Sequence, residues 1–170
     1  MAEVTPLPQD CGQVCGGRCC LPSEGSSGML LFPGEEEGME EAGFSLTPAS
    51  EGVLLTCGGT CQREKRPLAC RFFPLFPHLD EQGRIRAVYD PRGYRLCPLL
   101  QASERVELDK DFVRAVRRAG RVLAGDEACR AFLRKISVEI DELDRFLRLG
   151  EGRSPICRRC IHRQFENAEN

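Results

Sequence analysis

Residues 11–20 read CGQVCGGRCC, so four cysteines fall within ten residues, and three glycines lie between them. The four thiols are Cys11, Cys15, Cys19 and Cys20. Glycine lets a loop fold back tightly and lets peptide N–H groups approach a thiolate sulfur. A tetrahedral zinc ion and an iron–sulfur cluster are each held by four such ligands. We therefore expect this segment to fold around a metal and to organise the chain.

Cys19 and Cys20 are adjacent in the sequence. Neighbouring side chains of an extended chain point to opposite sides. We therefore expect one of the pair to face a second metal, the edge of a cluster, or the core.

A second cysteine-rich segment, residues 57–74, reads CGGTCQREKRPLACRFFP. With a later cysteine it supplies a second set of four thiols: Cys57, Cys61, Cys70 and Cys97. This set can form a second four-thiolate site or share ligands with the first. Basic residues surround the thiols at Arg63, Lys65, Arg66 and Arg71. Cations lower the pKa of a thiol and offset the charge of a thiolate site, although an exposed basic turn explains each arginine equally well.

Two further cysteines, Cys157 and Cys160, stand in a Cys-Arg-Arg-Cys spacing near the C-terminus, followed by His162. This pair can complete a metal site that begins upstream, act as a redox pair, or be two incidental thiols. Cys129 falls on the apolar face of an expected helix and is assigned to packing. His78 is expected in a turn rather than as a ligand.

The eleven cysteines form an odd total, which leaves at least one thiol outside any set of intramolecular disulfides. The N-terminal residues MAEVTPLPQDCG lack the basic and apolar regions of a secretory signal, and no apolar run is long enough to span a membrane. We therefore expect a cytoplasmic protein, in which clustered cysteines bind metal more often than they form disulfides. A formal charge of −2 gives no general attraction to nucleic acid or to an anionic membrane, and we expect neither as a partner.

Composition divides the chain into three zones. We expect a loop-rich metal-binding lobe over residues 1–100, a helical hairpin over 101–150 and a CxxC tail over 151–170. A chain of 170 residues suffices for a single compact domain. The predicted fold is a small, loop-rich α+β domain in which the cysteine lobe packs on an antiparallel helical hairpin.

Within the lobe, short extended pieces are expected at residues 29–32, 53–56 and 85–89. Gly83 is expected to close a small hairpin before the last of these. The acidic run after Pro33-Gly34 suits the first turn of a short helix.

Two helices are predicted in the second zone. Asp109 is a suitable N-cap, and Phe112, Val116, Ala119 and Leu123 follow at helical spacing. Gly125 is expected to end this helix, and Asp126 to cap the next. The second apolar stripe comprises Cys129, Leu133, Ile136, Ile140, Leu143 and Leu147, with Gly150 as the stop. The two stripes are expected to bury each other.

Together the two cysteine segments resemble the CxxCxxCC family of cysteine-cluster proteins, which occurs in bacteria and some other organisms. The resemblance spans roughly residues 11–98 and is carried by Cys15-Gly-Gly-Arg-Cys19-Cys20, Cys61 and the segment RPLACRFFP at 66–74. The leading cysteines differ from the family pattern by gaps of three residues instead of two. The resemblance implies a zinc- or iron-chelating domain. Flagellin lysine-N-methylase resembles the same family, but methyl transfer does not follow for this short chain.

The leading function is therefore metal binding by thiolates, with zinc or iron as the metal. A second hypothesis is an iron–sulfur protein in redox chemistry or protein modification. A third treats the cysteine lobe as a scaffold that presents the basic residues 63–71 to an acidic protein partner. No Ser-His-Asp signature or phosphate-binding glycine loop is present, and with two histidines general bases are scarce. Whether the protein is an enzyme is left open.

Overall fold

A computed structural model describes residues 4–20, 28–59, 61–101 and 106–151, without the side chains of residues 63 and 148–151. The helices are α1 (Cys11–Cys15), α2 (Leu68–Phe72), α3 (Pro98–Gln101), α4 (Lys110–Leu123) and α5 (Glu127–Glu151). Short 3₁₀ helices are η1 (Arg18–Cys20), η2 (Arg63–Lys65) and η3 (Pro91–Gly93). The strands are β1 (Met29–Leu30), β2 (Ser45–Ala49), β3 (Gly52–Thr56), β4 (Leu75–Leu79) and β5 (Ile85–Tyr89). The predicted α+β class is confirmed.

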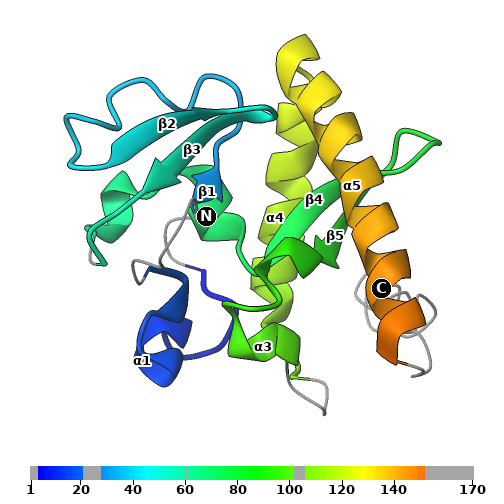
Figure 1. Cartoon of the computed structure of the whole chain (residues 1–170), viewed down its shortest axis with the longest axis horizontal. Coiled ribbons are helices and arrows are strands. Elements are labelled where there is room, and N and C mark those ends of the chain that lie inside the picture. The colour runs from blue at the N-terminus through cyan, green and yellow to red at the C-terminus, as the bar shows by residue number, and fades with distance from the viewer. Residues whose placement is uncertain (1–3, 21–27, 60, 102–105, 152–170) are drawn as a thin grey trace.

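Two small antiparallel sheets are present in the described residues (Figure 1). In the first, β3 lies between β1 and β2, with Leu55 opposite both Met29 and Leu46. The second is the β4–β5 hairpin, in which Leu75 pairs with Tyr89 and Leu79 with Ile85. Strand β5 has the bounds expected from the sequence, and Gly83 takes the positive φ of 76° that its turn requires.

The two long helices begin where their caps predict. The Asp109 carboxylate accepts hydrogen bonds from the N–H groups of Asp111 and Phe112 at 2.8 and 3.1 Å. Asp126 accepts one from the Cys129 N–H at 2.8 Å. Helix α4 ends at Leu123, close to the expected Gly125, whereas α5 runs through Gly150 to Glu151.

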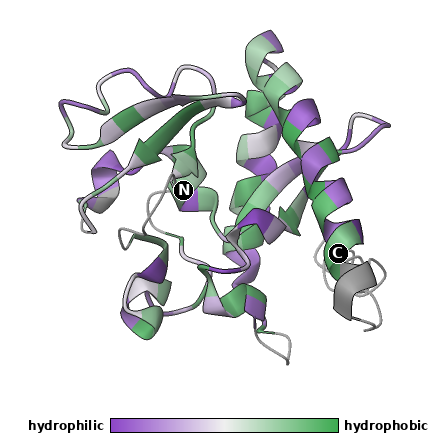
Figure 2. Ribbon diagram, in the orientation of Figure 1, coloured by the Kyte–Doolittle hydropathy of each residue, from purple (hydrophilic) through white to green (hydrophobic). Residues whose placement is uncertain are grey.

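Both helices bury their apolar stripes mainly against the β4–β5 hairpin, not mainly against each other. Helix α4 packs on β4 and β5, and α5 packs on β4. Figure 2 shows hydrophilic residues alternating with hydrophobic ones along α5, as a half-buried helix requires. Because β4 and β5 belong to the zone expected to form the metal-binding lobe, the expected boundary near residue 100 does not separate two cores.

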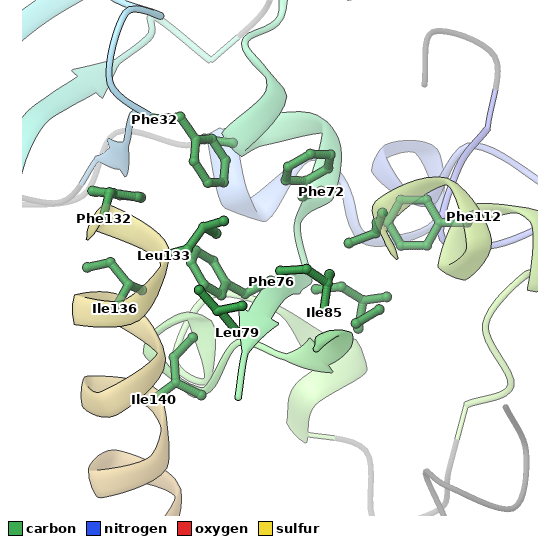
Figure 3. Packing of buried hydrophobic residues seen from close by; sticks show 14 of the residues in the cluster. Phe32, Phe72, Phe76, Leu79, Ile85, Phe112, Phe132, Leu133, Ile136 and Ile140 are labelled. Atoms are coloured by element: carbon green, nitrogen blue, oxygen red, sulfur yellow. The ribbon is translucent and has the colours of Figure 1, made fainter. Parts of the chain in front are cut away.

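One core joins the hairpin, the helices and the N-terminal half of the chain. Phe32, which follows β1, contacts three other phenylalanine rings in this core: its ring lies 5.5 Å from Phe72, 6.0 Å from Phe76 and 5.4 Å from Phe132, measured between centroids. Figure 3 shows these side chains pointing toward one another from α2, β4 and α5. Aromatic residues make up only 6% of the chain, yet they connect its distant segments.

The short acidic helix expected in the first zone is absent from the described residues. The acidic run after Pro33-Gly34 forms successive turns over residues 33–43 and not a helix. The two glycines within it, Gly38 and Gly43, have positive φ values of 74° and 89°, which a right-handed helix cannot accommodate.

Among the described residues, no helix combines the length and the apolar composition needed to cross a membrane.

Candidate metal centre

Eight of the nine cysteines that the structure describes belong to one neighbourhood, and all nine are free thiols. We call these eight the cysteine cluster: Cys11, Cys15, Cys19, Cys20, Cys57, Cys61, Cys70 and Cys97. They come from α1 and η1, from the loop after β3, from α2, and from the residue before α3. Segments almost ninety residues apart in the sequence therefore bring thiols together (α1 and α3 in Figure 1).

The N-terminal part of the cluster is a helical turn followed by a glycine bend. Asp10 caps α1 by accepting a hydrogen bond from the Gly12 N–H at 3.0 Å. Gly16 and Gly17 then take positive φ values of 67° and 66°, and the Gly17 N–H donates to the Gly12 carbonyl at 2.8 Å. This bend turns the chain back so that the next residues can lie beside α1.

Cys19 and Cys20 lie in η1, with their sulfur atoms 3.9 Å apart. The backbone here is therefore not extended, as the sequence argument assumed, but the expectation that one of the pair faces a second metal, the edge of a cluster or the core stays a prediction. In a 3₁₀ turn, successive side chains are about 120° apart around the axis, and the two thiols can contact each other.

The loop after β3 approaches the same pair. The Cys57 Sγ lies 3.9 Å from the Cys20 carbonyl oxygen. Gly59, with a φ of 95°, passes so close that a Cβ there would lie 3.7 Å from that oxygen. The two cysteine-rich segments of the sequence are thus in contact at Cys20.

Arg66 is the basic residue that enters the cluster. Its Nε donates to the Cys61 Sγ at 3.2 Å. It also lowers the pKa values of Cys11 and Cys20, although neither effect is the largest on its thiol. Arg71 instead donates to the Glu64 carbonyl at 2.8 Å, and Lys65 is exposed.

Burial raises the pKa of several cluster thiols. It is the first cause for Cys11, Cys57 and Cys97, and it raises the pKa of Cys70 to about 12. Neighbouring thiols add to the effect in each case. The hydrogen bond between Cys19 and Cys20 lowers the pKa of Cys20 and raises that of Cys19. Groups of this kind ionise together only when positive charge accompanies them.

The cluster is a neighbourhood and not a finished coordination sphere. In the described part of the chain, no three Cys, His, Asp or Glu side chains already stand close enough to hold one metal ion. The donor set nevertheless suits a thiophilic metal, because the eight cluster residues are thiols and zinc and iron–sulfur clusters take four thiolates each. Glycine-rich loops at residues 16–17 and 58–59 carry several of them and can adjust.

The remaining candidate residues lie apart from the cluster. Cys129 is 6% exposed on α5 and contacts the Pro33 carbonyl at 3.7 Å, which confirms its assignment to packing. His78 is not in a turn: it lies in β4, is 8% exposed and its Nε2 is 3.2 Å from an Asp141 carboxylate oxygen. Cys157, Cys160 and His162 lie outside the described residues, as does the expected tail from residue 152 onward.

Asp10 was missed as a residue of the cluster. It contributes charge beside Cys11, Cys20 and Arg66, in addition to capping α1. An aspartate directly before the first cysteine is a recognisable N-cap, but a helix of five residues is too short to show any periodicity.

Comparisons with protein families, with characterised proteins and with solved structures found no match to this chain, so the resemblance of residues 11–98 to the cysteine-cluster family stays an expectation.

Proposed function

We propose that the cysteine cluster binds zinc, or iron in an iron–sulfur cluster, through its thiolates. The observation that carries the proposal is the convergence of eight free thiols from four separate parts of the chain. Disulfides would use the same proximity, but the described cysteines form none. Burial together with like neighbours makes ionisation of Cys11, Cys57, Cys70 and Cys97 costly, and a bound cation removes that cost.

The way the N-terminal segment is held also supports the proposal. Pro6 and Leu7 are buried before it, and Leu31 and Phe32 are buried after it. Between these anchors, α1 and η1 contain no buried residue. A helix of five residues is far below the length of about 12 residues at which an isolated helix becomes even marginally stable. A structural zinc ion can supply on the order of 10 kcal/mol to such a segment.

Zinc and iron are separated by a direct experiment. The full chain is purified without oxygen, and its zinc and iron are measured by elemental analysis relative to chain concentration. Zinc gives a colourless protein, whereas thiolate-bound iron–sulfur clusters give a brown protein with visible absorption. We expect at least one equivalent of zinc, or iron and sulfide in the ratio of a cluster.

Cys129 provides the matched control. Replacing Cys57 or Cys70 with Ser should lower the metal content, and Cys129→Ser, a thiol of the same chain outside the cluster, should leave it unchanged. Metal-free protein that keeps its native hydrogen-exchange pattern over residues 11–20 would contradict the proposal. So would equal metal loss in the Cys129→Ser protein and in the cluster variants.

A further inference from the structure

The thiols of the cluster are not equally close to one another. Cys11 and Cys15 are four residues apart in α1, hence on one face and about 6 Å apart along the axis. The leading neighbours of Cys11 among the thiols are Cys15 and Cys97, and Cys15 is the thiol that acts on Cys97. Cys97 directly precedes α3, which lies next to α1 in Figure 1, so Cys97 is a neighbour of the α1 thiols although the sequence groups it with the segment that begins at Cys57.

Cys20 lies next to the segment that begins at Cys57. Its carbonyl oxygen is in contact with the Cys57 thiol, and the loop carries Gly59 past that same oxygen. The thiol of Cys70 has Cys20, Cys61 and Cys57 as its neighbours, in that order of influence. Cys61 is the fourth thiol of the group formed with Cys20, Cys57 and Cys70, and its Sγ accepts a hydrogen bond from the Arg66 Nε–H.

Cys19 and Cys20 join the two groups. Besides Cys20, the leading thiol neighbours of Cys19 are Cys11 and Cys15. Those of Cys20 are Cys19 and Cys57. The bend at Gly16 and Gly17 turns the chain back toward α1, and the pair in η1 has thiol neighbours in both groups.

We infer that the cluster forms two separate four-thiolate metal sites, one of Cys11, Cys15, Cys19 and Cys97 and the other of Cys20, Cys57, Cys61 and Cys70. Each set has the four thiolates that one zinc ion or one iron–sulfur cluster requires. A zinc ion with four thiolates carries a net charge of about −2, and Arg66, which acts on Cys11 as well as on Cys20, Cys61 and Cys70, lies where it can offset charge from both sites. This inference rests on the proposed function, because it assigns ligands for metals that the cluster is proposed to bind.

The strongest competing arrangement places Cys19 and Cys20 on the same ion. A tetrahedral ion with sulfur ligands at about 2.3 Å separates those sulfurs by about 3.8 Å, which is close to the 3.9 Å between the two thiols. The test must therefore determine which metal each member of the pair binds.

The full chain, with Cys157→Ser and Cys160→Ser to remove the tail thiols, is loaded with the NMR-active cadmium isotope without oxygen. We expect two cadmium equivalents and two cadmium signals. In a proton–cadmium correlation, the Cys19 β protons should couple to the cadmium shared with Cys11, Cys15 and Cys97. The Cys20 β protons should couple to the other. Coupling of both residues to a single cadmium would overturn the inference.

Metal counts in variants give an independent test. In the same background, Cys15→Ser and Cys57→Ser should each lower the content from two equivalents to one, and Cys129→Ser should leave two. The double variant Cys15→Ser/Cys19→Ser should still bind one metal equivalent. The double variant Cys15→Ser/Cys20→Ser should bind none.

The possible failures are distinguishable. If the parent protein binds no metal, the proposed function fails and the inference with it. If it binds one equivalent, or if Cys15→Ser alone removes all metal while circular dichroism shows helices α4 and α5 intact, only the division into two sites fails. Two signals with a different assignment of Cys19 or Cys97 would likewise overturn the stated ligand sets and leave metal binding standing.

Discussion

The carboxylate of Glu35 accepts a hydrogen bond from the backbone N–H of Leu68, thirty-three residues further along the chain. Its second oxygen accepts from the Phe32 N–H at 3.0 Å. Leu68 begins α2, whose N-cap residue, Pro67, makes no side-chain capping bond. Glu35 therefore caps α2 from a distant turn, and α2 carries Cys70. Burial raises the pKa of Glu35, although backbone N–H groups from three residues oppose that effect.

Removing this cap should destabilise the fold and loosen α2. Glu35→Ala leaves two backbone N–H groups without their acceptor, and we expect a loss of about 1–3 kcal/mol in the free energy of unfolding. Urea unfolding measures the loss, and faster amide exchange at Leu68 and Ala69 locates it. Glu37→Ala, an exposed glutamate of the same turn, is the control and should change stability by less than about 0.5 kcal/mol. Equal effects of the two substitutions would show that the cap contributes nothing.

Phe32 should be among the most costly core positions to truncate. Its ring contacts three other phenylalanine rings and is 2% exposed. Phe32→Ala should cost about 3–5 kcal/mol of unfolding free energy, through lost burial and the cavity that remains. Phe146→Ala, at a phenylalanine that is 71% exposed, should cost far less. Thermal unfolding followed by circular dichroism compares the two, and similar melting temperatures would contradict the packing described here.

The sequence predicts the local features of this fold better than the non-local ones. Asp109, Asp126 and Gly83 act as expected because a cap or a turn depends on a few neighbouring residues. The hairpin expected at Gly83 implied a strand before it, but the bounds of β4 were not predicted, because Pro74 and Pro77 argue against a strand. Yet β4 lies within residues 74–79, the longest buried run in the part of the chain that the structure describes. Strand β5 and the two helices pack against β4, and burial by such distant segments cannot be predicted from a local sequence pattern.

The candidate site shows the same division. The residue types and their spacing single out the eight thiols, but they leave open which thiols are neighbours. Sequence proximity associates Cys20 with Cys11 and Cys97 with Cys57. The fold instead brings Cys97 beside α1 and the Cys57 loop beside Cys20. These neighbours depend on how the residues between the two cysteine segments fold, which neither segment encodes.

Helix α4 lies tightly against the β4–β5 hairpin at Gly120. A Cβ at this position would lie 2.5 Å from the Pro77 Cβ and 2.9 Å from the Ile85 Cγ2. Alanine favours a helix over glycine by about 1 kcal/mol, but the overlap should outweigh this gain, and we expect Gly120→Ala to destabilise the protein by about 1–3 kcal/mol. Arg118→Ala, on the exposed side of the same helix, should change stability little. A more stable Gly120→Ala protein would show that the helix can move away at no cost.

Acid should weaken the β4–β5 turn through Asp80. Partial burial acts to raise its pKa, but hydrogen bonds from Arg84 and the charges of Arg84 and Arg86 outweigh burial and lower it. Because the folded-state pKa lies below the unfolded value of about 3.9, the ionised carboxylate stabilises the fold above that pH. The contribution is lost as the pH falls through the folded pKa.

Asp80→Asn should therefore lower stability at pH 7 by about 1 kcal/mol, since the ion pairs are partly exposed to solvent. The difference from the unsubstituted protein should shrink as the pH falls to about 3. Urea unfolding at several pH values measures this difference, in which pH effects common to both proteins cancel. Glu81→Gln, at the exposed neighbouring residue, is the control. If the difference stays constant with pH, the lost stability comes from the changed shape and hydrogen bonding of the side chain and not from its charge.

Removal of metal should loosen only part of the chain. Residues 11–20 have no buried anchor in α1 or η1, and the loop at 57–61 contacts them. By contrast, β4, β5 and the first half of α5 are held by the aromatic and aliphatic core. After complete chelation at neutral pH, amide exchange should therefore accelerate strongly in residues 11–20 and 57–71 and much less in 75–89 and 110–140. Uniform acceleration would mean that the cluster and the core unfold as one unit, and unchanged exchange at residues 11–20 would mean that metal does not hold them.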